Sequence, residues 1–281
     1  MEKPYYHPAR SDAQFFPPTR RLQFMCLLIL AHQVAREYPL LVAANRDEFH
    51  ARPTSVSDFW AAHPELLAGR DLQQGGTWMG VTRSGRFAAV TNYRDPSQSA
   101  VAPRSRGELP VAYLTGSKDP EAFLKTIAPM ARDYGGFNLL VGDRRNLWYF
   151  TNSDGMDPQC LPPGVYGLSN ARLDTPWPKV ELGKARMLAL LQAGPISHSA
   201  LATVVTDRRL ADPRTLSGHG LDGNMETTLS AQFIVTEAYG TRSSTTVWTD
   251  THNQASWREQ SFNEEGALNS VQHKEFSLSA A

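Results

Sequence analysis

Apolar segments of this chain come in pairs that only a few residues separate. Three such pairs are Thr77–Thr82 with Arg86–Tyr93, Gly136–Val141 with Leu147–Thr151, and Ala231–Thr236 with Ser244–Trp248. So short a connection predicts a β-hairpin, in which the two strands are antiparallel. Parallel strands need crossover connections of a dozen or more residues, so a sheet of alternating parallel strands and helices is excluded.

A fourth pair lies near the beginning of the chain. The apolar runs Phe24–Ala31 and Leu40–Ala44 flank a turn at residues 37–39. Arg20 and Arg21 before the first run resemble the start of a signal peptide, but the run is short and no small-residue cleavage site follows it. Because the second run supplies a partner strand, a buried hairpin is the favoured interpretation.

Apolar residues at helical spacing predict four helices, which are Glu108–Leu114, Asp119–Arg132, Val180–Gln192 and Ser199–Thr206. The order along the chain is therefore hairpins, two helices, hairpins, two helices and hairpins. Two antiparallel sheets that pack face to face and are covered by helices fit this order best. We predict an α+β fold, a four-layer αββα sandwich of two antiparallel sheets.

Composition divides the chain into three parts. Residues 1–24 contain four prolines and no apolar periodicity, which predicts a disordered leader, a mis-assigned start or a removable pro-segment. From residue 25 to about residue 262 there is no linker, repeat or low-complexity segment, so we expect a single domain. Residues 263–281 are rich in small and polar residues and are expected to form a flexible C-terminal tail.

Charge and cysteine content exclude several classes of protein. The 281 residues carry 28 basic and 28 acidic side chains, so no excess positive charge is available for nucleic acid. Two cysteines cannot build a disulfide framework, and the longest apolar run is far shorter than the roughly 20 residues of an integral membrane segment. The eight histidines are scattered, so we expect no metal site and no cofactor. We expect a cytoplasmic protein that binds a small molecule.

Polar residues recur where the apolar strands end. Asn45, Arg46, Asp47 and Glu48 directly follow an apolar strand, where an unpaired charge is costly. The same pattern recurs at residues 69–71, 91–94, 136–138, 168–170 and 239–244. Together these positions predict one polar site that is built at strand ends.

These sequence blocks resemble those of the NRDE (transport and Golgi organization protein 2-like) family. The resemblance rests on Met25–Cys26, Ala44–Glu48, Gly69–Asp71, Gly75–Gly80, Thr91–Arg94, Ser105–Gly107, Gly136–Leu139, Leu168–Asn170, Leu173–Lys179 and Tyr239–Ser243. It covers roughly residues 25–262. The resemblance implies no single reaction, because eukaryotic members are associated with secretory-pathway organisation, mitochondria, and lipid or haem handling.

A second resemblance supplies chemistry. The layout is similar to that of N-terminal-nucleophile hydrolases of the choloylglycine hydrolase and penicillin V acylase type, which implies an N-terminal-nucleophile hydrolase-like sandwich. In those enzymes a mature N-terminal Cys is followed by an Arg, an Asp, two Asn residues and a later Arg. Matched residue by residue, these catalytic roles fall on Cys26, Arg46, Asp47, Asn92, Asn170 and Arg242. The acid lies a few positions beyond the Arg in that family, so Asp47 and Glu48 both remain candidates.

The resemblance implies that Cys26 is a nucleophile only in a chain that begins at Cys26. There the α-amine, with a pKa near 8, accepts the proton of a thiol whose pKa is near 8.5. Arg46 would favour the thiolate and Asn92 would stabilise an oxyanion. Asn170 and Arg242 would hold the substrate. The candidate substrate-binding residues are Glu48, Trp78, Tyr93 and Asn138.

The predicted function is hydrolysis of a linear acyl-amide through a thioester on Cys26. The alternative is a non-catalytic protein that uses the same cleft to bind or traffic a hydrophobic ligand, such as haem or an acyl group. Free cysteine is among the most buried residue types, which favours the alternative. A scaffold role ranks third, because nothing in the sequence resembles an exposed interaction stripe.

Overall fold

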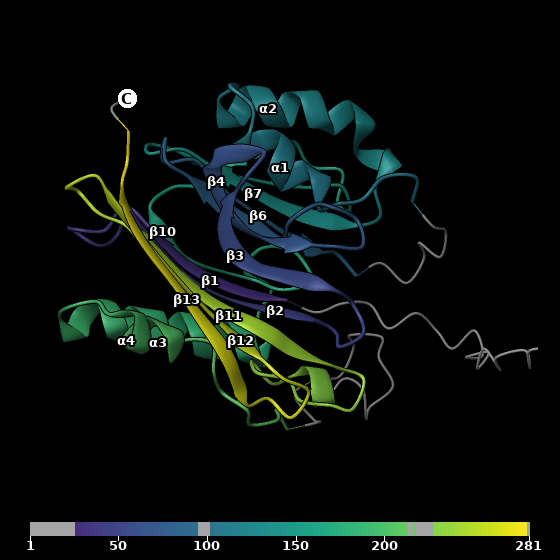
Figure 1. The fold of residues 1–281 in the computed structure, drawn as a ribbon, viewed down its shortest axis with the longest axis vertical. Helices are drawn as coiled ribbons and strands as arrows, with labels where there is room; N and C mark the ends of the chain where they lie inside the picture. The colour runs from purple at the N-terminus through teal and green to yellow at the C-terminus, as the bar shows by residue number, and fades with distance from the viewer. Residues whose placement is uncertain (1–25, 95–101, 213–215, 217–226, 280–281) are drawn as a thin grey trace, which may run out of the picture.

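The structure of the protein is a computed structural model that describes residues 26–94, 102–212, 216 and 227–279. The predicted leader, residues 1–24, lies outside the described residues. The described chain forms two β-sheets that lie face to face, with helices on the outer face of each sheet (Figure 1). The predicted four-layer sandwich of two antiparallel sheets is confirmed.

In the described chain, sheet A has six strands in the order β10-β1-β2-β11-β12-β13, and every neighbouring pair is antiparallel. Its strands are β1 (Leu27–His32), β2 (Leu40–Phe49), β10 (Gly164–Leu168), β11 (Tyr239–Thr249), β12 (Gln254–Phe262) and β13 (Leu268–Ser277). The hairpin predicted near the beginning of the chain is confirmed as β1 and β2. Because β2 pairs with β1 on one side and with β11 on the other, its side chains have neighbours from both ends of the chain.

Sheet B has seven strands in the described chain, and their order in the sheet is their order in the sequence. The strands are β3 (Thr54–Trp60), β4 (His63–Asp71), β5 (Met79–Thr82), β6 (Phe87–Asn92), β7 (Phe137–Gly142), β8 (Leu147–Thr151) and β9 (Gln159–Cys160). Two predicted hairpins are confirmed as β5–β6 and β7–β8.

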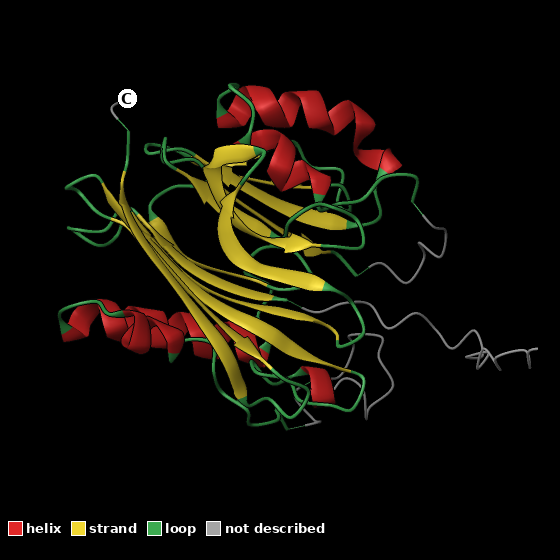
Figure 2. Cartoon of the chain, in the orientation of Figure 1, coloured by secondary structure: helices red, strands yellow, loops and turns green. Residues whose placement is uncertain are grey.

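Helices cover the outer face of each sheet (Figure 2). Over sheet B lie α1 (Glu108–Leu114), α2 (Pro120–Ile127) and the 3₁₀ helix η1 (Ala128–Asp133), and over sheet A lie α3 (Pro178–Ala193) and α4 (His198–Ala202). The start of α2 is encoded locally. The carboxylate of Asp119 accepts the N–H of Ala122 at 2.8 Å, and Pro120 occupies the first turn. The predicted helix Glu108–Leu114 is confirmed with the same bounds. Asp119–Arg132 is confirmed as α2 followed by η1, and the other two predicted helices are confirmed with shifted ends.

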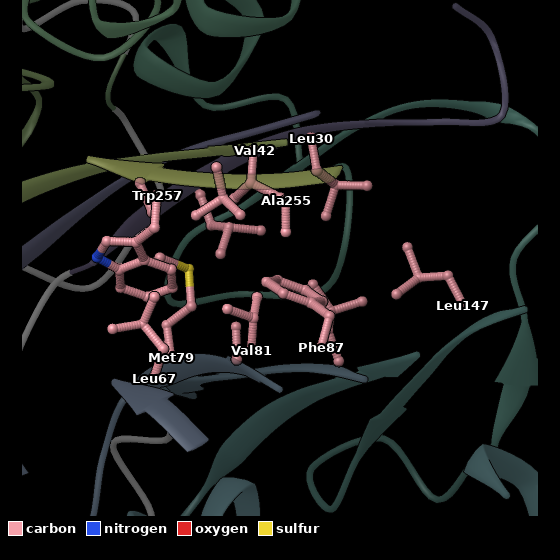
Figure 3. Packing of buried hydrophobic residues seen from close by; sticks show 14 of the residues in the cluster. Leu30, Val42, Leu67, Met79, Val81, Phe87, Leu147, Ala255 and Trp257 are labelled. Carbon is pink, nitrogen blue, oxygen red and sulfur yellow. The ribbon is translucent and has the colours of Figure 1, made fainter. Parts of the chain in front are cut away.

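Apolar side chains from both sheets fill the space between them (Figure 3). Leu30 and Val42 of sheet A belong to the same buried cluster as Met79 of sheet B. Trp257 of β12 is fully buried, and its indole N–H donates to the hydroxyl of Ser57 in β3 at 2.8 Å. The sheets are therefore joined by burial of apolar surface and by a polar contact that the core encloses.

The prediction that Ala231–Thr236 forms a strand is wrong. The strand of this region begins at Tyr239 and pairs with β2 and β12, so it is β11 that completes sheet A. The N–H of Ile234 donates instead to the hydroxyl of Thr241 at 2.9 Å. Ala231–Ile234 are buried, and Val235 forms only an isolated bridge with Gly240, so the segment joins neither sheet as a strand.

The prediction of a flexible C-terminal tail is wrong for Leu268–Ser277. These residues form β13, which pairs with β12 along its length. Most of the strand is exposed and polar, as is common at a sheet edge, so its composition resembles that of a tail. Its buried aromatic residue lies near the C-terminal end of the strand, where Phe276 packs edge-on against Phe59 of β3 with 5.4 Å between the ring centroids.

Candidate active site

Successive residues at the end of β2 face opposite layers of the sandwich, because side chains alternate along a strand. Asn45 faces the helices over sheet A, and its amide donates to two main-chain carbonyl oxygens at 2.7 Å. Arg46 faces sheet B, where its guanidinium lies 4.4 Å from the centroid of the Trp78 ring. Glu48 lies on the same side as Arg46, and Asp47 lies on the helix side. The segment therefore serves two separate environments.

Cys26 directly precedes β1. Continuing the register of β1 places it opposite Arg46 on one side and opposite Asn170 on the other. Its carbonyl oxygen accepts the hydroxyl of Ser169 at 2.8 Å, and its sulfur accepts the backbone N–H of Asp47. The structure thus brings Cys26, Arg46 and Asn170 together at one end of the space between the sheets.

The thiol of Cys26 is held in its protonated form. Although the residue keeps some exposed surface, burial of its sulfur raises the pKa from 9.0 to about 12, and the negative charge of Asp47 adds to the rise. The positive charge of Arg46 acts in the opposite direction. In a chain where Met25 precedes it, Cys26 is therefore a thiol at neutral pH and needs a base to become a nucleophile.

Ion pairs fix the side chain of Arg46. Its Nη2 lies 3.6 Å from Oε2 of Glu48, and its Nη1 donates to the hydroxyl of Thr54 at 3.1 Å. Arg52 lies 3.6 Å from the same Glu48 oxygen and donates to Asp71 at 2.5 Å. Burial lowers the pKa of Arg46 and raises the pKa of Glu48, because each charge loses contact with water. The opposite charge of the partner counteracts the shift of each pKa.

Asp47 is a buried acid with an unused oxygen. Its Oδ1 accepts the hydroxyl of Thr241 at 2.6 Å, whereas Oδ2 has no hydrogen-bond partner among the described residues. Burial raises the pKa of Asp47, and the positive charge of Lys179 in α3 opposes that rise. Lys179 is itself buried, which lowers its pKa, and its ammonium donates to the carbonyl oxygen of Leu229 at 3.2 Å.

The two candidate Asn residues meet where sheet B approaches the end of β10. The amide N–H of Asn170 donates to the carbonyl oxygen of Asn92, the last residue of β6, at 2.9 Å. The next residue, Tyr93, donates its N–H to the carbonyl oxygen of Gly136 at 2.9 Å. Asn92 is thus held beside Asn170, which in turn lies opposite Cys26.

Asn138 has the contacts of a residue that joins the two sheets. It is fully buried, and its amide donates to Thr91 at 3.1 Å and to the carbonyl oxygen of Ala171 at 2.9 Å. Its own oxygen accepts the hydroxyl of Tyr149 at 2.7 Å. All these partners belong to the protein, so Asn138 keeps the loop after β10 on sheet B, and its part in substrate binding stays a prediction.

A β-bulge sends Arg242 out of the ladder between β11 and β2. The register shifts between Thr241 and Ser243, and Arg242 donates from Nη1 to the carbonyl oxygens of Phe49 and His50, each at 2.9 Å. The positive charge of Arg242 helps to lower the pKa of Arg46. Arg242 therefore anchors the end of β2, and its role in holding the substrate stays a prediction.

The sequence analysis gave no role to two cations near the site, the buried Lys179 and the half-buried Arg106. The charges of Lys179 and Arg106 both interact with Cys26. A signal existed for Lys179, because it occupies the first turn of α3, where the helix dipole disfavours a positive charge. Arg106 lies in the block Ser105–Gly107, which resembles the family, but no pattern in the sequence indicated that its charge is close to Cys26.

Two antiparallel sheets between helical layers, with a thiol, an arginine and two asparagines at one end, define a four-layer αββα-sandwich protein. The chain belongs to the family described as Transport and Golgi organisation 2, whose sequence profile matches residues 25–264. The family resemblance expected from the sequence blocks is confirmed.

Characterised relatives agree with this membership. The transport and Golgi organization protein 2 homologs of Bos taurus and Homo sapiens are 35% and 36% identical over 240 residues, which cover 80% of this chain and 87% of each relative. Transport and Golgi organization protein 2 of Drosophila melanogaster is 27% identical over 176 residues, or 56% of this chain and 60% of that protein.

Among solved structures, the Caenorhabditis elegans ortholog of N-acylethanolamine-hydrolyzing acid amidase is similar with a TM-score of 0.48 at 11% identity, over 79% of this chain and 92% of that chain. Within the described residues, no group of three or more His, Cys, Asp or Glu side chains is arranged to hold a metal ion. None of the helices described is both long and apolar enough to cross a membrane.

Proposed function

We propose that this protein is an amidohydrolase whose nucleophile is the thiol of Cys26 and whose base is the α-amine of the same residue. The observation that carries the proposal is the position of Cys26 between Arg46 and Asn170, beside a buried Asp47 with an unpartnered carboxylate oxygen. A thiol with a pKa of about 12 is inert without a base, and an α-amine with a pKa near 8 supplies one. The proposal requires a chain that begins at Cys26.

The reaction is an acyl transfer in two halves. The α-amine accepts the thiol proton while the sulfur attacks the carbonyl carbon of the amide. Asn92 and Asn170 donate hydrogen bonds to the negative oxygen that forms. The ammonium then returns the proton to the leaving nitrogen, the carbon–nitrogen bond breaks, and a thioester remains on Cys26. Water attacks the thioester in the same way, which releases a carboxylic acid and restores the thiol.

We assign the acid that orients the ammonium to Asp47 rather than to Glu48. The backbone N–H of Asp47 already bonds the sulfur of Cys26, and its Oδ2 is free to accept another donor. Glu48 is committed to Arg46 and Arg52 and accepts the N–H of Phe49 at 2.8 Å. Glu48 therefore acts as a positioning residue for Arg46.

The test compares the full chain with a chain that begins at Cys26. Both are incubated with a panel of linear acyl-amides, and intact mass is measured for an acyl adduct. We expect an adduct only in the chain that begins at Cys26, with loss of the adduct in Cys26→Ala and its retention in the control Cys160→Ala, which removes the exposed thiol. Equal turnover by the full chain, or turnover that survives Cys26→Ala, contradicts the mechanism.

A second candidate function is non-catalytic binding or trafficking of a hydrophobic ligand, such as haem or an acyl group, in the same cleft. The observation that favours it is the raised pKa of the Cys26 thiol, which suppresses nucleophilic reactivity in the full chain. Arg46→Ala separates the two functions. An enzyme loses turnover while substrate binding is largely kept, whereas a carrier loses affinity for an anionic group of its ligand and has no turnover to lose.

We also propose a cytoplasmic location. Cys26 and Cys160 are both free thiols, which a reducing compartment preserves. Fractionation of cells that express the full chain tests this, and recovery in a membrane-enclosed oxidising compartment contradicts it.

A further inference from the structure

Arginine and carboxylate side chains gather beside Cys26. The arginines are Arg46, Arg52, Arg106 and Arg242, and the carboxylates are Asp47, Glu48 and Asp71. Arg46 pairs with Glu48 and Arg52 pairs with Asp71, while Arg242 is held by main-chain carbonyls. Like Arg242, Arg106 forms no ion pair with a described residue, and the carbonyl oxygen of Gly136 is its one hydrogen-bond partner among them.

Backbone packing fixes where Arg106 lies. The next residue, Gly107, accepts the N–H of Thr77 at 3.0 Å, and its backbone lies so close to Gly76 that a Cβ on Gly76 would overlap it. The Nη1 of Arg106 donates to the carbonyl oxygen of Gly136 at 2.9 Å. Arg106 is therefore anchored between the starts of β5 and β7, at the end of sheet B where Asn92 also lies.

The guanidinium of Arg106 reaches the candidate nucleophile electrostatically. Its charge interacts with Arg52, Cys26 and Glu48, and burial lowers its pKa. Only Nη1 has a hydrogen-bond partner among the described residues, so Nε and Nη2 remain available. A guanidinium presents its donors in a planar fork that matches a carboxylate or a phosphate. Arg106 is half-buried, so water screens its charge only in part and an anion bound beside it would be stabilised.

A second polar group near the nucleophile lacks a partner. Ser243 pairs with Arg46 in the register of β11 and β2, and it is only 6% exposed. Its hydroxyl is buried and has no hydrogen-bond partner among the described residues. A buried hydroxyl without a partner costs free energy, which a ligand with acceptor oxygens would recover.

We infer that Arg106 and Ser243 recognise an anionic group, a carboxylate or a phosphate, on the molecule that binds next to Cys26. This inference rests on the proposed function for the amide bond, and it adds the class of substrate: an amide that carries an anion close to the bond to be cleaved. Arg106 binds the anion through its fork, and Ser243 donates a hydrogen bond to the same molecule.

The experiment uses matched amides in which only the anion changes. One pair, N-lauroylglycine and N-lauroylethanolamine, places a carboxylate in the amine half, and the phosphate ester of N-lauroylethanolamine replaces that carboxylate by a phosphate. A second pair, N-benzylsuccinamic acid and N-benzylbutanamide, places the carboxylate in the acyl half. Turnover is measured with the chain that begins at Cys26, and Kd is measured by calorimetry in its Cys26→Ala variant.

We expect an anionic amide to bind about 10- to 100-fold more tightly than its neutral partner, as loss of a charge-assisted hydrogen bond implies. Arg106→Gln should abolish this preference, and Arg106→Lys should restore part of it. Ser243→Ala should weaken the anionic ligand alone. Arg104→Gln is the matched control, because Arg104 is more exposed and pairs with Glu108. It should leave the preference unchanged.

The outcomes separate the two proposals. An Arg106-dependent preference in binding without any cleavage supports the anion site and overturns the amidohydrolase. Cleavage of the neutral and anionic amides at the same rate, with equal Kd values, overturns the anion site and leaves the amidohydrolase standing. A preference that persists in Arg106→Gln also overturns the inference, and circular dichroism of each variant excludes unfolding as the cause.

Discussion

Alkylation of Cys26 with iodoacetamide measures how strongly the folded site suppresses its thiol. The pKa rises from 9.0 to about 12, so at pH 8 the thiolate fraction falls about 1,000-fold. A more basic thiolate is also a better nucleophile, with a Brønsted coefficient of about 0.4–0.5, which returns part of the loss. We expect Cys26 of the full chain to react about 30- to 60-fold more slowly than a thiol with a pKa of 9.0.

The protein contains its own reference, because Cys160 is exposed. Peptide mass spectrometry after timed alkylation between pH 7 and 9.5 gives both rates in one sample. Two variants set the sign of each charge. Asp47→Asn removes a charge that raises the thiol pKa, so it should accelerate alkylation of Cys26, and Arg46→Ala should slow it further.

The chain that begins at Cys26 completes the comparison. Its α-amine should raise the alkylation rate of Cys26 below pH 9, because the amine accepts the thiol proton. If Cys26 of the folded full chain reacts as fast as Cys160 at pH 8, burial does not control the thiol and the reasoning is refuted. Equal rates in wild type, Asp47→Asn and Arg46→Ala would refute the electrostatic part alone.

Three further predictions concern stability. Burial lowers the pKa of His198 from 6.5 to about 3. As the pH falls, His198 is therefore protonated in the unfolded chain at a pH where it is still neutral in the folded chain. Stability should fall by about 2 kcal/mol between pH 7.5 and 5, and His198→Asn should flatten this slope in urea titrations. Phe276→Ala should lower the free energy of unfolding by about 3 kcal/mol, because Phe276 packs on Phe59; an unchanged value would leave β13 dispensable. Gly76→Ala should lower the melting temperature by overlap with Gly107, at a cost of about 1–3 kcal/mol.

The central hairpins of the fold could be predicted because their signal is local. β5 and β6 are apolar runs on either side of a short turn, and β1 and β2 repeat the pattern. The edge strand β13 could not be predicted in this way, because an exposed edge needs few apolar residues. Ala231–Thr236 misled for the opposite reason, since most of its apolar residues are buried in a loop, where the hydroxyl of Thr241 accepts the backbone N–H of Ile234.

Only the part of the candidate site that depends on the alternation of side chains along one strand could be predicted from the sequence. Alternation along β2 places Arg46 and Glu48 on one side, and the structure has them as an ion pair. The bulge that redirects Arg242 and the glycine contact that places Arg106 depend on pairings between segments far apart in the sequence. Lys179 depends likewise on how α3 packs over sheet A.

The hydrogen bonds that Arg242 donates to the end of β2 have a consequence for truncated forms of this protein. The side chain that anchors the carbonyl oxygens of Phe49 and His50 is translated almost 200 residues after them. A premature stop codon that removes β11 therefore deletes the anchor of Phe49 and His50, which both remain in the truncated chain. Such an allele is expected to behave as a complete loss of function, and the missing C-terminal segment, supplied as a separate chain, should not restore activity.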